Sequence, residues 1–210
     1  MLLFNREVQT VGNPEQIMPL VQSFVNVANE AGVTLNVWSG SNGYVPGTLS
    51  FSGVYESVSE MSAGAAKINA SKKWWETISN FREYVVTTKP DSVYNYVRGG
   101  VKGVVVPNGT IVQQNSFQMS NGSDFIQTLT WMNELIDATM KITGIDSQIC
   151  HSLYGTLGEV GYLTFFANAE QFDEAREKVL ANAEWLPKFL EGGKYSIPGT
   201  VMQRHMVKIA

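Results

Sequence analysis

The chain of 210 residues carries a formal net charge of −4, and 44% of its residues are hydrophobic, which suits one large globular domain or two small ones. The acidic balance provides no basic field for nucleic acid, and no stretch has the apolar length of a membrane span or a signal peptide. The single cysteine, Cys150, cannot form an internal disulfide, which fits a reducing compartment. Taken together, these features lead us to expect a soluble protein of the cytoplasm, with neither nucleic acid nor membrane as partner.

The first half of the chain predicts six elements in the order strand, helix, strand, strand, helix and strand. The first strand covers 2–11 and is followed by a helix that begins at Asn13. Pro14 stands at the favoured first helical position, and Gly32 is a natural residue for the end of this helix. The remaining strands are expected over 33–39, 47–55 and 93–98, with one long helix over 58–81.

The second half predicts the same six elements in the same order. Its first strand covers 110–119, and its first helix has Ser123 as the N-terminal cap and stops at Gly144. The later strands are expected over 145–153, 158–166 and 200–209, with one long helix over 169–190.

The two halves also share a residue spacing, which predicts a tandem duplication. Gly47 and Gly158 each open a third strand with alternating apolar residues, and they lie 111 positions apart. A capping box and a tryptophan repeat at the same spacing, in the pairs Ser57 and Asn168, Glu60 and Gln171, and Trp74 and Trp185. We therefore expect repeats over 1–103 and 104–210, joined at the glycine-rich segment 99–103.

The order β-α-β-β-α-β is that of a ferredoxin-like unit. Two such units in one chain resemble the dimeric α+β barrel superfamily, in which two units join their antiparallel sheets into one barrel with helices outside. This resemblance implies an α+β fold in which the usual homodimer becomes an internal pseudo-dimer. It also implies a ligand space next to the sheet, because several members are cofactor-independent monooxygenases or haem-degrading enzymes.

The haem-degrading members use an Asn on the first strand and a Trp and a His on the second helix. Asn5 and Asn115 match the Asn of that pattern and align with each other at a spacing of 110. The helix positions do not match, because the Trp is replaced by Gly64 and Ala175, and the His by Trp74 and Trp185. Without the haem ligand we expect no cofactor.

Two histidines, His151 and His205, are the candidate catalytic residues, and both lie in the second half. Either could carry a proton near neutral pH or bind haem. The alternative, which we favour, is an imidazole hydrogen-bonded in or beside the sheet. No metal site is expected, since the sequence has no His-x-His, HExxH or CxxC pattern.

Asn5, Asn115, Trp38 and Tyr162 are the candidate ligand-binding residues, because strand amides and aromatic rings suit a flat organic ligand. The alternative for the aromatic residues is a place in the core or at an oligomer interface. If Trp75 faces outward, it favours association between chains, and a homo-oligomer is expected.

Two functions remain open. The first is a barrel that binds a small hydrophobic molecule or acts as an oligomeric scaffold. The second is a cofactor-independent, monooxygenase-like enzyme that acts on a hydrophobic organic substrate. A sealed barrel would exclude the enzyme, whereas an open cavity lined by His151 or His205 would favour it.

Overall fold

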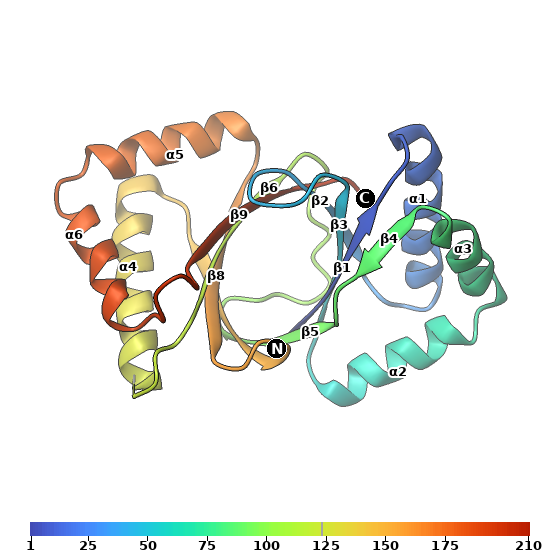
Figure 1. Ribbon diagram of the computed structural model, residues 1–210, viewed down its shortest axis with the longest axis horizontal. Coiled ribbons are helices and arrows are strands. Elements are labelled where there is room, and N and C mark those ends of the chain that lie inside the picture. The colour runs from blue at the N-terminus through green and yellow to red at the C-terminus, as the bar shows by residue number, and fades with distance from the viewer. Residues whose placement is uncertain (123) are drawn as a thin grey trace.

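A closed barrel of antiparallel strands forms the centre of the computed structural model, which describes residues 1–122 and 124–210 (Figure 1). Eight strands of the described chain make the ring, in the order β1-β3-β2-β9-β6-β8-β7-β5, and β5 returns to β1. Their bounds are β1 Leu2–Thr10, β2 Asn36–Gly40, β3 Thr48–Tyr55, β5 Ser92–Arg98, β6 Ile111–Gln118, β7 Ser147–Tyr154, β8 Glu159–Phe166 and β9 Met202–Lys208.

The helices lie outside the barrel in two groups, one for each half of the chain (Figure 1). The first group contains α1 Pro14–Glu30, α2 Val58–Asn69 and α3 Lys72–Arg82. The second group contains α4 Phe125–Thr143, α5 Ala169–Ala181 and α6 Trp185–Leu190, with a short 3-10 turn over Glu191–Lys194. Within the described residues, no helix combines the length and the apolar composition that crossing a membrane requires.

Each half contributes a four-stranded ferredoxin-like sheet, β5-β1-β3-β2 from the first and β9-β6-β8-β7 from the second. The two sheets meet at two antiparallel seams. Trp38 of β2 pairs with Lys208 of β9, and Tyr96 of β5 pairs with Cys150 of β7. Because both seams are hydrogen-bonded, neither sheet keeps a long free edge. The predicted α+β pseudo-dimeric barrel is confirmed.

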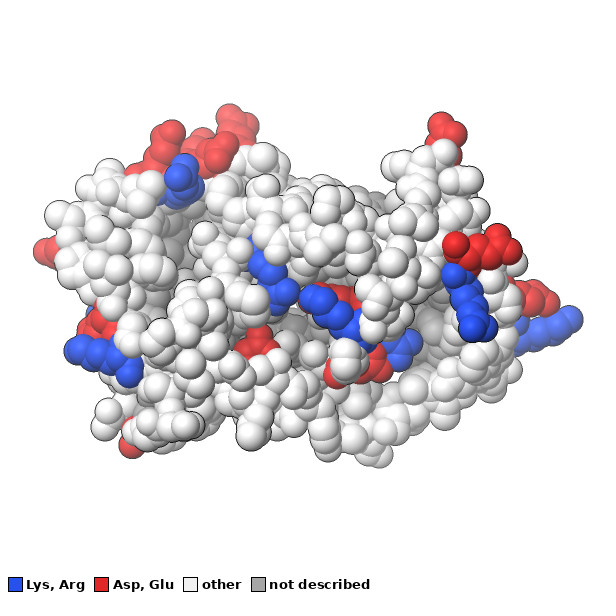
Figure 2. Space-filling view, viewed as in Figure 1, with Lys and Arg blue, Asp and Glu red and all other residues white. Residues whose placement is uncertain are grey.

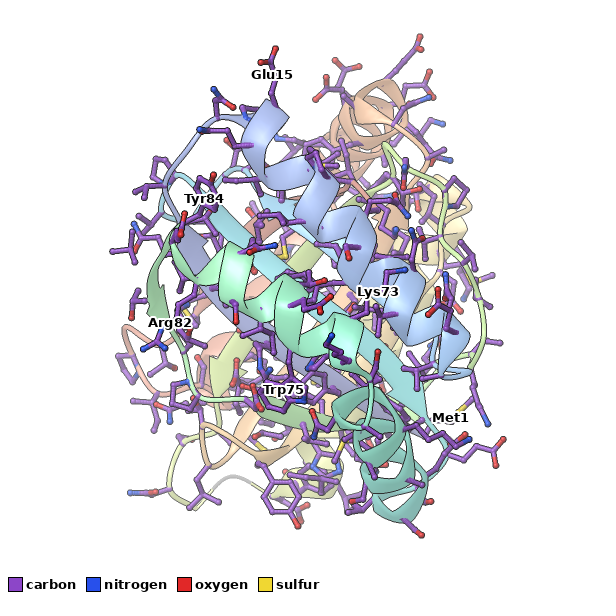
Figure 3. All side chains as sticks on the ribbon, turned by 90° about the vertical axis from the view of Figure 1, so that its right-hand side faces the viewer. Met1, Glu15, Lys73, Trp75, Arg82 and Tyr84 are labelled. Carbon is purple, nitrogen blue, oxygen red and sulfur yellow. The ribbon has the colours of Figure 1, made fainter. Side chains whose placement is uncertain are left out.

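The outer face of each sheet is the hydrophobic core of its half. In the first half, Phe24 of α1 packs edge-to-face against Phe51 of β3 and Phe81 of α3, with ring centroids 5.7 and 5.2 Å apart. Figure 3 shows α1 and α3 side by side over this face. In the second half, Met132 and Ile136 of α4 are almost completely buried in the corresponding core. Burying each such side chain stabilises the fold by about 1.5–3 kcal/mol.

The predicted long helices over 58–81 and 169–190 are wrong, because each consists of two helices. The first breaks at Ser71, whose side chain accepts a hydrogen bond from the backbone N–H of Trp74 and so starts α3. The second breaks at Asn182, whose side chain accepts from the backbone N–H groups of Glu184 and Trp185. Short polar side chains of this kind compete with the helix for backbone donors.

Two further local features differ from the sequence expectations. An additional strand, β4 (Val85–Thr88), pairs with the C-terminal part of β1 beside the ring. Ser123, the expected cap of the first helix in the second half, lies outside the described residues. The described cap is Asp124, whose side chain accepts from the backbone N–H groups of Ile126 and Gln127 at 2.7 and 3.2 Å.

Candidate functional site

The interior of the barrel holds a cavity of about 510 Å³ that is partly open to solvent. Its walls are the side chains that alternate strand positions direct inward, and its lining is mostly apolar. The volume falls within the range of small-molecule sites, roughly 300–1,000 Å³. The interior of the barrel is therefore a solvent-accessible cavity and not a packed core.

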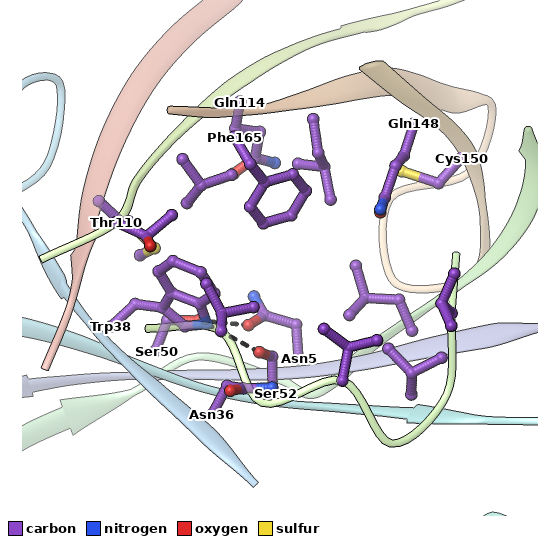
Figure 4. A pocket seen from close by; sticks show the side chains of 18 of the residues that line it. Asn5, Asn36, Trp38, Ser50, Ser52, Thr110, Gln114, Gln148, Cys150 and Phe165 are labelled. Atoms are coloured by element: carbon purple, nitrogen blue, oxygen red, sulfur yellow. Dashed lines mark hydrogen bonds between the residues drawn. The ribbon is translucent and has the colours of Figure 1, made fainter. Parts of the chain in front are cut away.

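One wall of the cavity is polar and comes from β1, β2 and β3 of the first half (Figure 4). Ser50 donates a hydrogen bond to the Asn5 amide oxygen, and the Trp38 indole N–H donates to Ser52 Oγ at 2.9 Å. Asn36 contributes an amide oxygen that is buried without a hydrogen-bond partner in the described chain. A buried polar atom of this kind is costly unless something fills its hydrogen bond. This wall therefore offers positions for a polar group of a ligand.

The opposite wall is mainly apolar and comes from β6, β8 and β9 of the second half. Val112, Leu163 and Met206 line it together with Phe165, whose ring lies 6.0 Å from the Trp38 ring between centroids. Figure 4 shows Phe165 across the cavity from Asn5, Ser50 and Ser52. An apolar ring placed here is in contact with hydrocarbon on one side and with hydroxyl and amide groups on the other.

The segment that joins the two halves covers part of the cavity. Val101, Val104 and Val106 line it from this segment, and Val104 keeps half of its surface exposed. The segment turns at Gly99 and Gly100, both at positive φ, which glycine adopts without strain. A connection that exists only because both units share one chain therefore forms part of the binding space.

Cys150 and three tyrosines place weak hydrogen-bond donors in the cavity wall or close to it. None of these four side chains is a strong base. Burial raises the pKa of the Cys150 thiol to about 12, so the thiol stays protonated at neutral pH. Burial likewise raises the pKa of Tyr94 and Tyr96 in the wall and of Tyr44, which donates to Gln114 at 3.0 Å. Cys150 is consequently not an activated nucleophile.

A second, charged pocket of about 150 Å³ adjoins the cavity at one end of the barrel. Asn5 and Tyr94 line both spaces, and the charged pocket adds Glu7, Glu159 and Arg204 among its walls. Figure 2 shows positive and negative side chains gathered in the middle of this face of the molecule. The interior thus changes from apolar to charged along the barrel axis.

Both histidines lie on the outer face of the sheet, away from the cavity. The His151 ring is 5.3 Å from the Phe125 ring, and its Nε2 is 3.3 Å from the side-chain nitrogen of Asn95. The His205 ring is 4.7 Å from Phe172, and burial lowers the pKa of this imidazole. Strand alternation explains the result, because the neighbouring Cys150 and Met206 face inward.

The candidate pair Asn5 and Asn115 is divided between the two faces. Leu2 pairs with Tyr55, the last residue of β3, and Ile111 pairs with Phe166, the last residue of β8. This register makes Gln114, not Asn115, the counterpart of Asn5.

Asn115 faces outward, where its amide oxygen accepts from Gln203 at 3.0 Å. A slip of one residue reverses the face of a strand residue, so the spacing of 110 misassigned the pair.

The remaining candidates are also separated by the sheet. Trp38 lines the cavity, whereas Tyr162 packs with the outer core under α4, where burial raises its pKa. From the sequence we did not predict the cavity residues Gln114 and Gln148, nor the three valines of the segment that joins the two halves. Correct pairing of the strands would have found the two glutamines, because they occupy the inward positions of β6 and β7.

The residues of the cavity do not fit a histidine-ligated haem. Both histidines lie on the other face of the sheet, away from the cavity. Among the described residues, no three His, Cys, Asp or Glu side chains are grouped closely enough to hold a metal ion. No chemical step through haem or a bound metal is therefore derived for this barrel.

Trp75 faces solvent on α3, with 52% of its surface exposed, and its indole N–H donates to the carbonyl oxygen of Asn69 at 2.8 Å (Figure 3). Exposed rings of this size often mark interaction surfaces. Self-association stays a prediction that rests on this residue.

Comparison with known proteins places the fold among dimeric α+β barrels. No protein-family model and no curated protein matches the chain. A presumed monooxygenase from Fusobacterium nucleatum is similar in structure, with a TM-score of 0.73, 7% identity, and coverage of 100% of this chain and 92% of that one. A presumed monooxygenase from Lactobacillus acidophilus has a TM-score of 0.64 at 8% identity, covering 99% and 93%. An anthrone oxidase-like protein has a TM-score of 0.63 at 11% identity, covering 100% and 91%.

Proposed function

We propose that this protein binds a small hydrophobic organic molecule inside the barrel. The observation that carries the proposal is the cavity of about 510 Å³, whose one wall is apolar and whose other wall presents hydrogen-bonding groups. Transfer of an apolar ring from water to such a wall is favourable by about 25 cal/mol for each Å² buried. The few polar groups then select the ligand, as in most small-molecule sites.

The polar wall indicates which group the ligand carries. Asn36 Oδ1 is a buried acceptor without a partner in the described chain, so it favours a ligand hydroxyl or N–H at that point. The Asn5 amide oxygen already accepts from Ser50, which holds the amide in one orientation and leaves its nitrogen as a donor. A ring that bears a hydroxyl group suits this arrangement, because a hydroxyl both donates and accepts.

Filling the cavity with protein tests the proposal. The variant Val54→Trp adds an indole at a half-buried position of the wall, and Val86→Trp makes the same change on the exposed strand β4. We expect 2-naphthol to bind the unaltered protein in calorimetry, and Val54→Trp to weaken binding roughly tenfold or more. Val86→Trp should leave binding unchanged. Equal binding by all three proteins would place the ligand elsewhere and contradict the proposal.

Oxidation of the bound molecule is a second candidate function. Structural neighbours named as presumed monooxygenases or as anthrone oxidase-like support it, together with a wall that holds an amide and hydroxyl groups. In such a reaction a ring methylene loses two hydrogens and gains one oxygen atom of O₂. The second oxygen atom leaves with those hydrogens as water, so the substrate itself supplies the electrons. Solvent, to which the cavity is partly open, takes up the proton, and the Asn5 amide nitrogen would donate to the enolate oxygen that results.

Oxygen uptake with anthrone as the probe tests this second function. We expect uptake above the uncatalysed rate, with Asn5→Leu lowering it roughly tenfold or more, the usual scale for loss of one such donor. Asn115→Leu is the matched control, because Asn115 is the same residue type on the outer face of β6. Uptake at the uncatalysed rate would exclude oxidation of anthrone and leave the binding proposal standing.

A further inference from the structure

The charged pocket at the end of the barrel contains two opposite charges that the protein does not pair with each other. Among the described residues, four charged side chains contribute to it, Glu7, Lys89, Glu159 and Arg204. Two of them are already paired, because Lys89 Nζ lies 2.5 Å from Glu7 Oε2. Arg204 makes only a long ion pair with the same Glu7, at 3.9 Å, and Glu159 makes none within the described residues, so both charges can take a further partner.

Arg204 is a buried guanidinium with unused donors. Its side chain is only 13% exposed, and Nη1 lies 3.9 Å from Glu7 Oε1, beyond hydrogen-bond distance. Nε is buried without a partner in the described chain, and the guanidinium lies over the Tyr44 ring at 4.8 Å. A guanidinium has five N–H donors, and a carboxylate can accept two of them at once. The missing partner of Arg204 is thus an acceptor, best an anionic one.

Glu159 is the opposite case, a buried carboxylate with unused acceptors. The residue is 7% exposed, and its one hydrogen bond from a side chain in the described chain is a long one, from Tyr94 at 3.3 Å. Two carboxylate oxygens offer about four acceptor positions. The missing partner of Glu159 is a donor, best a cationic one.

We propose that the charged pocket binds the ammonium–carboxylate head group of a hydrophobic α-amino acid. The carboxylate accepts from Arg204, the ammonium group donates to Glu159, and the apolar side chain extends into the cavity. Both buried charges then have partners, which buried charges require. A simple carboxylate would face Glu159 with a like charge, and a simple amine would leave Arg204 Nε without a hydrogen-bond acceptor.

The arrangement of the two spaces suits a molecule of this length. Asn5 and Tyr94 line both, so the spaces are continuous at these residues. Met206 of the cavity and Arg204 of the charged pocket are two positions apart on β9, which is roughly 6–7 Å along a strand. An aromatic amino acid separates its ring from its head group by a similar distance. The proposal rests on ligand binding in the cavity and names the ligand class.

Calorimetry with four probes tests the proposal on the unaltered protein. The probes are L-phenylalanine, 3-phenylpropanoate, which lacks the ammonium group, 2-phenylethylamine, which lacks the carboxylate, and neutral 2-naphthol. We expect L-phenylalanine to bind at least about tenfold more tightly than either singly charged analogue. If either analogue binds as tightly as L-phenylalanine, the head-group assignment is overturned.

Two variants assign the charges to residues. Arg204→Gln should bring the affinity for L-phenylalanine down to that for 2-phenylethylamine, and Glu159→Gln should bring it down to that for 3-phenylpropanoate. The matched controls Arg6→Gln and Glu76→Gln alter exposed charges outside the barrel and should change nothing. If a pocket variant fails to fold, the four probes on the unaltered protein still test whether the pocket binds an amino-acid head group.

The 2-naphthol result separates the two proposals. If 2-naphthol binds and L-phenylalanine shows no preference over its analogues, the amino-acid proposal fails and cavity binding stands. If neither compound binds, cavity binding itself fails, and the amino-acid proposal fails with it.

Discussion

Equivalent strands of the two halves line the cavity, yet several equivalent inward positions differ in chemistry. The strand register makes Ser52 of the first half equivalent to Leu163 of the second, and Trp38 equivalent to Cys150. The outer faces are alike, since each buries an apolar core under its helices. Helix packing therefore requires apolar residues on the outer face, whereas the inner face lines a cavity and can carry polar residues as well.

The largest change in stability is expected when a buried residue of the outer core is truncated, compared with a residue of the cavity wall. Met132 of α4 is completely buried against the outer face of the sheet, so Met132→Ala should lower the free energy of unfolding by about 2–5 kcal/mol. Leu163→Ala removes a similar side chain from the cavity wall, where empty space already exists, and should cost less than about 1.5 kcal/mol. Urea denaturation measures both. Equal losses would mean that the interior of the barrel is packed like a core.

A smaller effect follows from making the two walls alike. Ser52→Leu places in the first half the residue that stands at the equivalent position of the second half. The change removes the acceptor of the Trp38 indole N–H and the polarity beside Asn5. We expect 2-naphthol to bind roughly tenfold more weakly, measured by calorimetry. The substitution Ser62→Leu on the exposed surface of α2 is the control. Unchanged affinity in Ser52→Leu would show that the polar wall does not contact the ligand.

The smallest effect concerns His205 on the outer face. Burial lowers its pKa in the folded protein, so the unfolded chain takes up a proton at higher pH than the folded one. Stability from this group is therefore present above the ordinary histidine pKa of about 6.5 and is lost as pH falls below that value. His205→Gln should reduce the drop in Tm between pH 7.5 and 5.5. Cavity binding should be unaffected by the same variant. A Tm drop that the variant leaves unchanged would show that another group titrates.

The sequence predicts the architecture well because hydrophobic periodicity and caps are local signals. The strand patterns, the Pro14 start and the spacing of 111 around Gly47 and Gly158 are sufficient for a pair of ferredoxin-like units. The helix breaks at Ser71 and Asn182 were not predicted. A Ser or Asn within a helical pattern can either continue the helix or cap a new one, and the tertiary packing decides between the two.

The site is predicted less well because inward and outward positions differ by one residue. Trp38 and Asn5 were singled out and line the cavity, whereas His151 and His205 were singled out for their chemistry alone and face the helices. Arg204 acquires its importance from Glu159 and Tyr94, which come from other strands. Only the closed barrel brings these residues together.

The most direct test of ligand binding in the barrel is a crystal structure of the protein grown with 2-naphthol. We expect one naphthol in the cavity, with its ring near Trp38 and Phe165 and its hydroxyl within hydrogen-bond distance of Asn36 or Asn5. A structure in which side chains fill the cavity, or in which the naphthol lies only on the outer surface, would contradict this expectation.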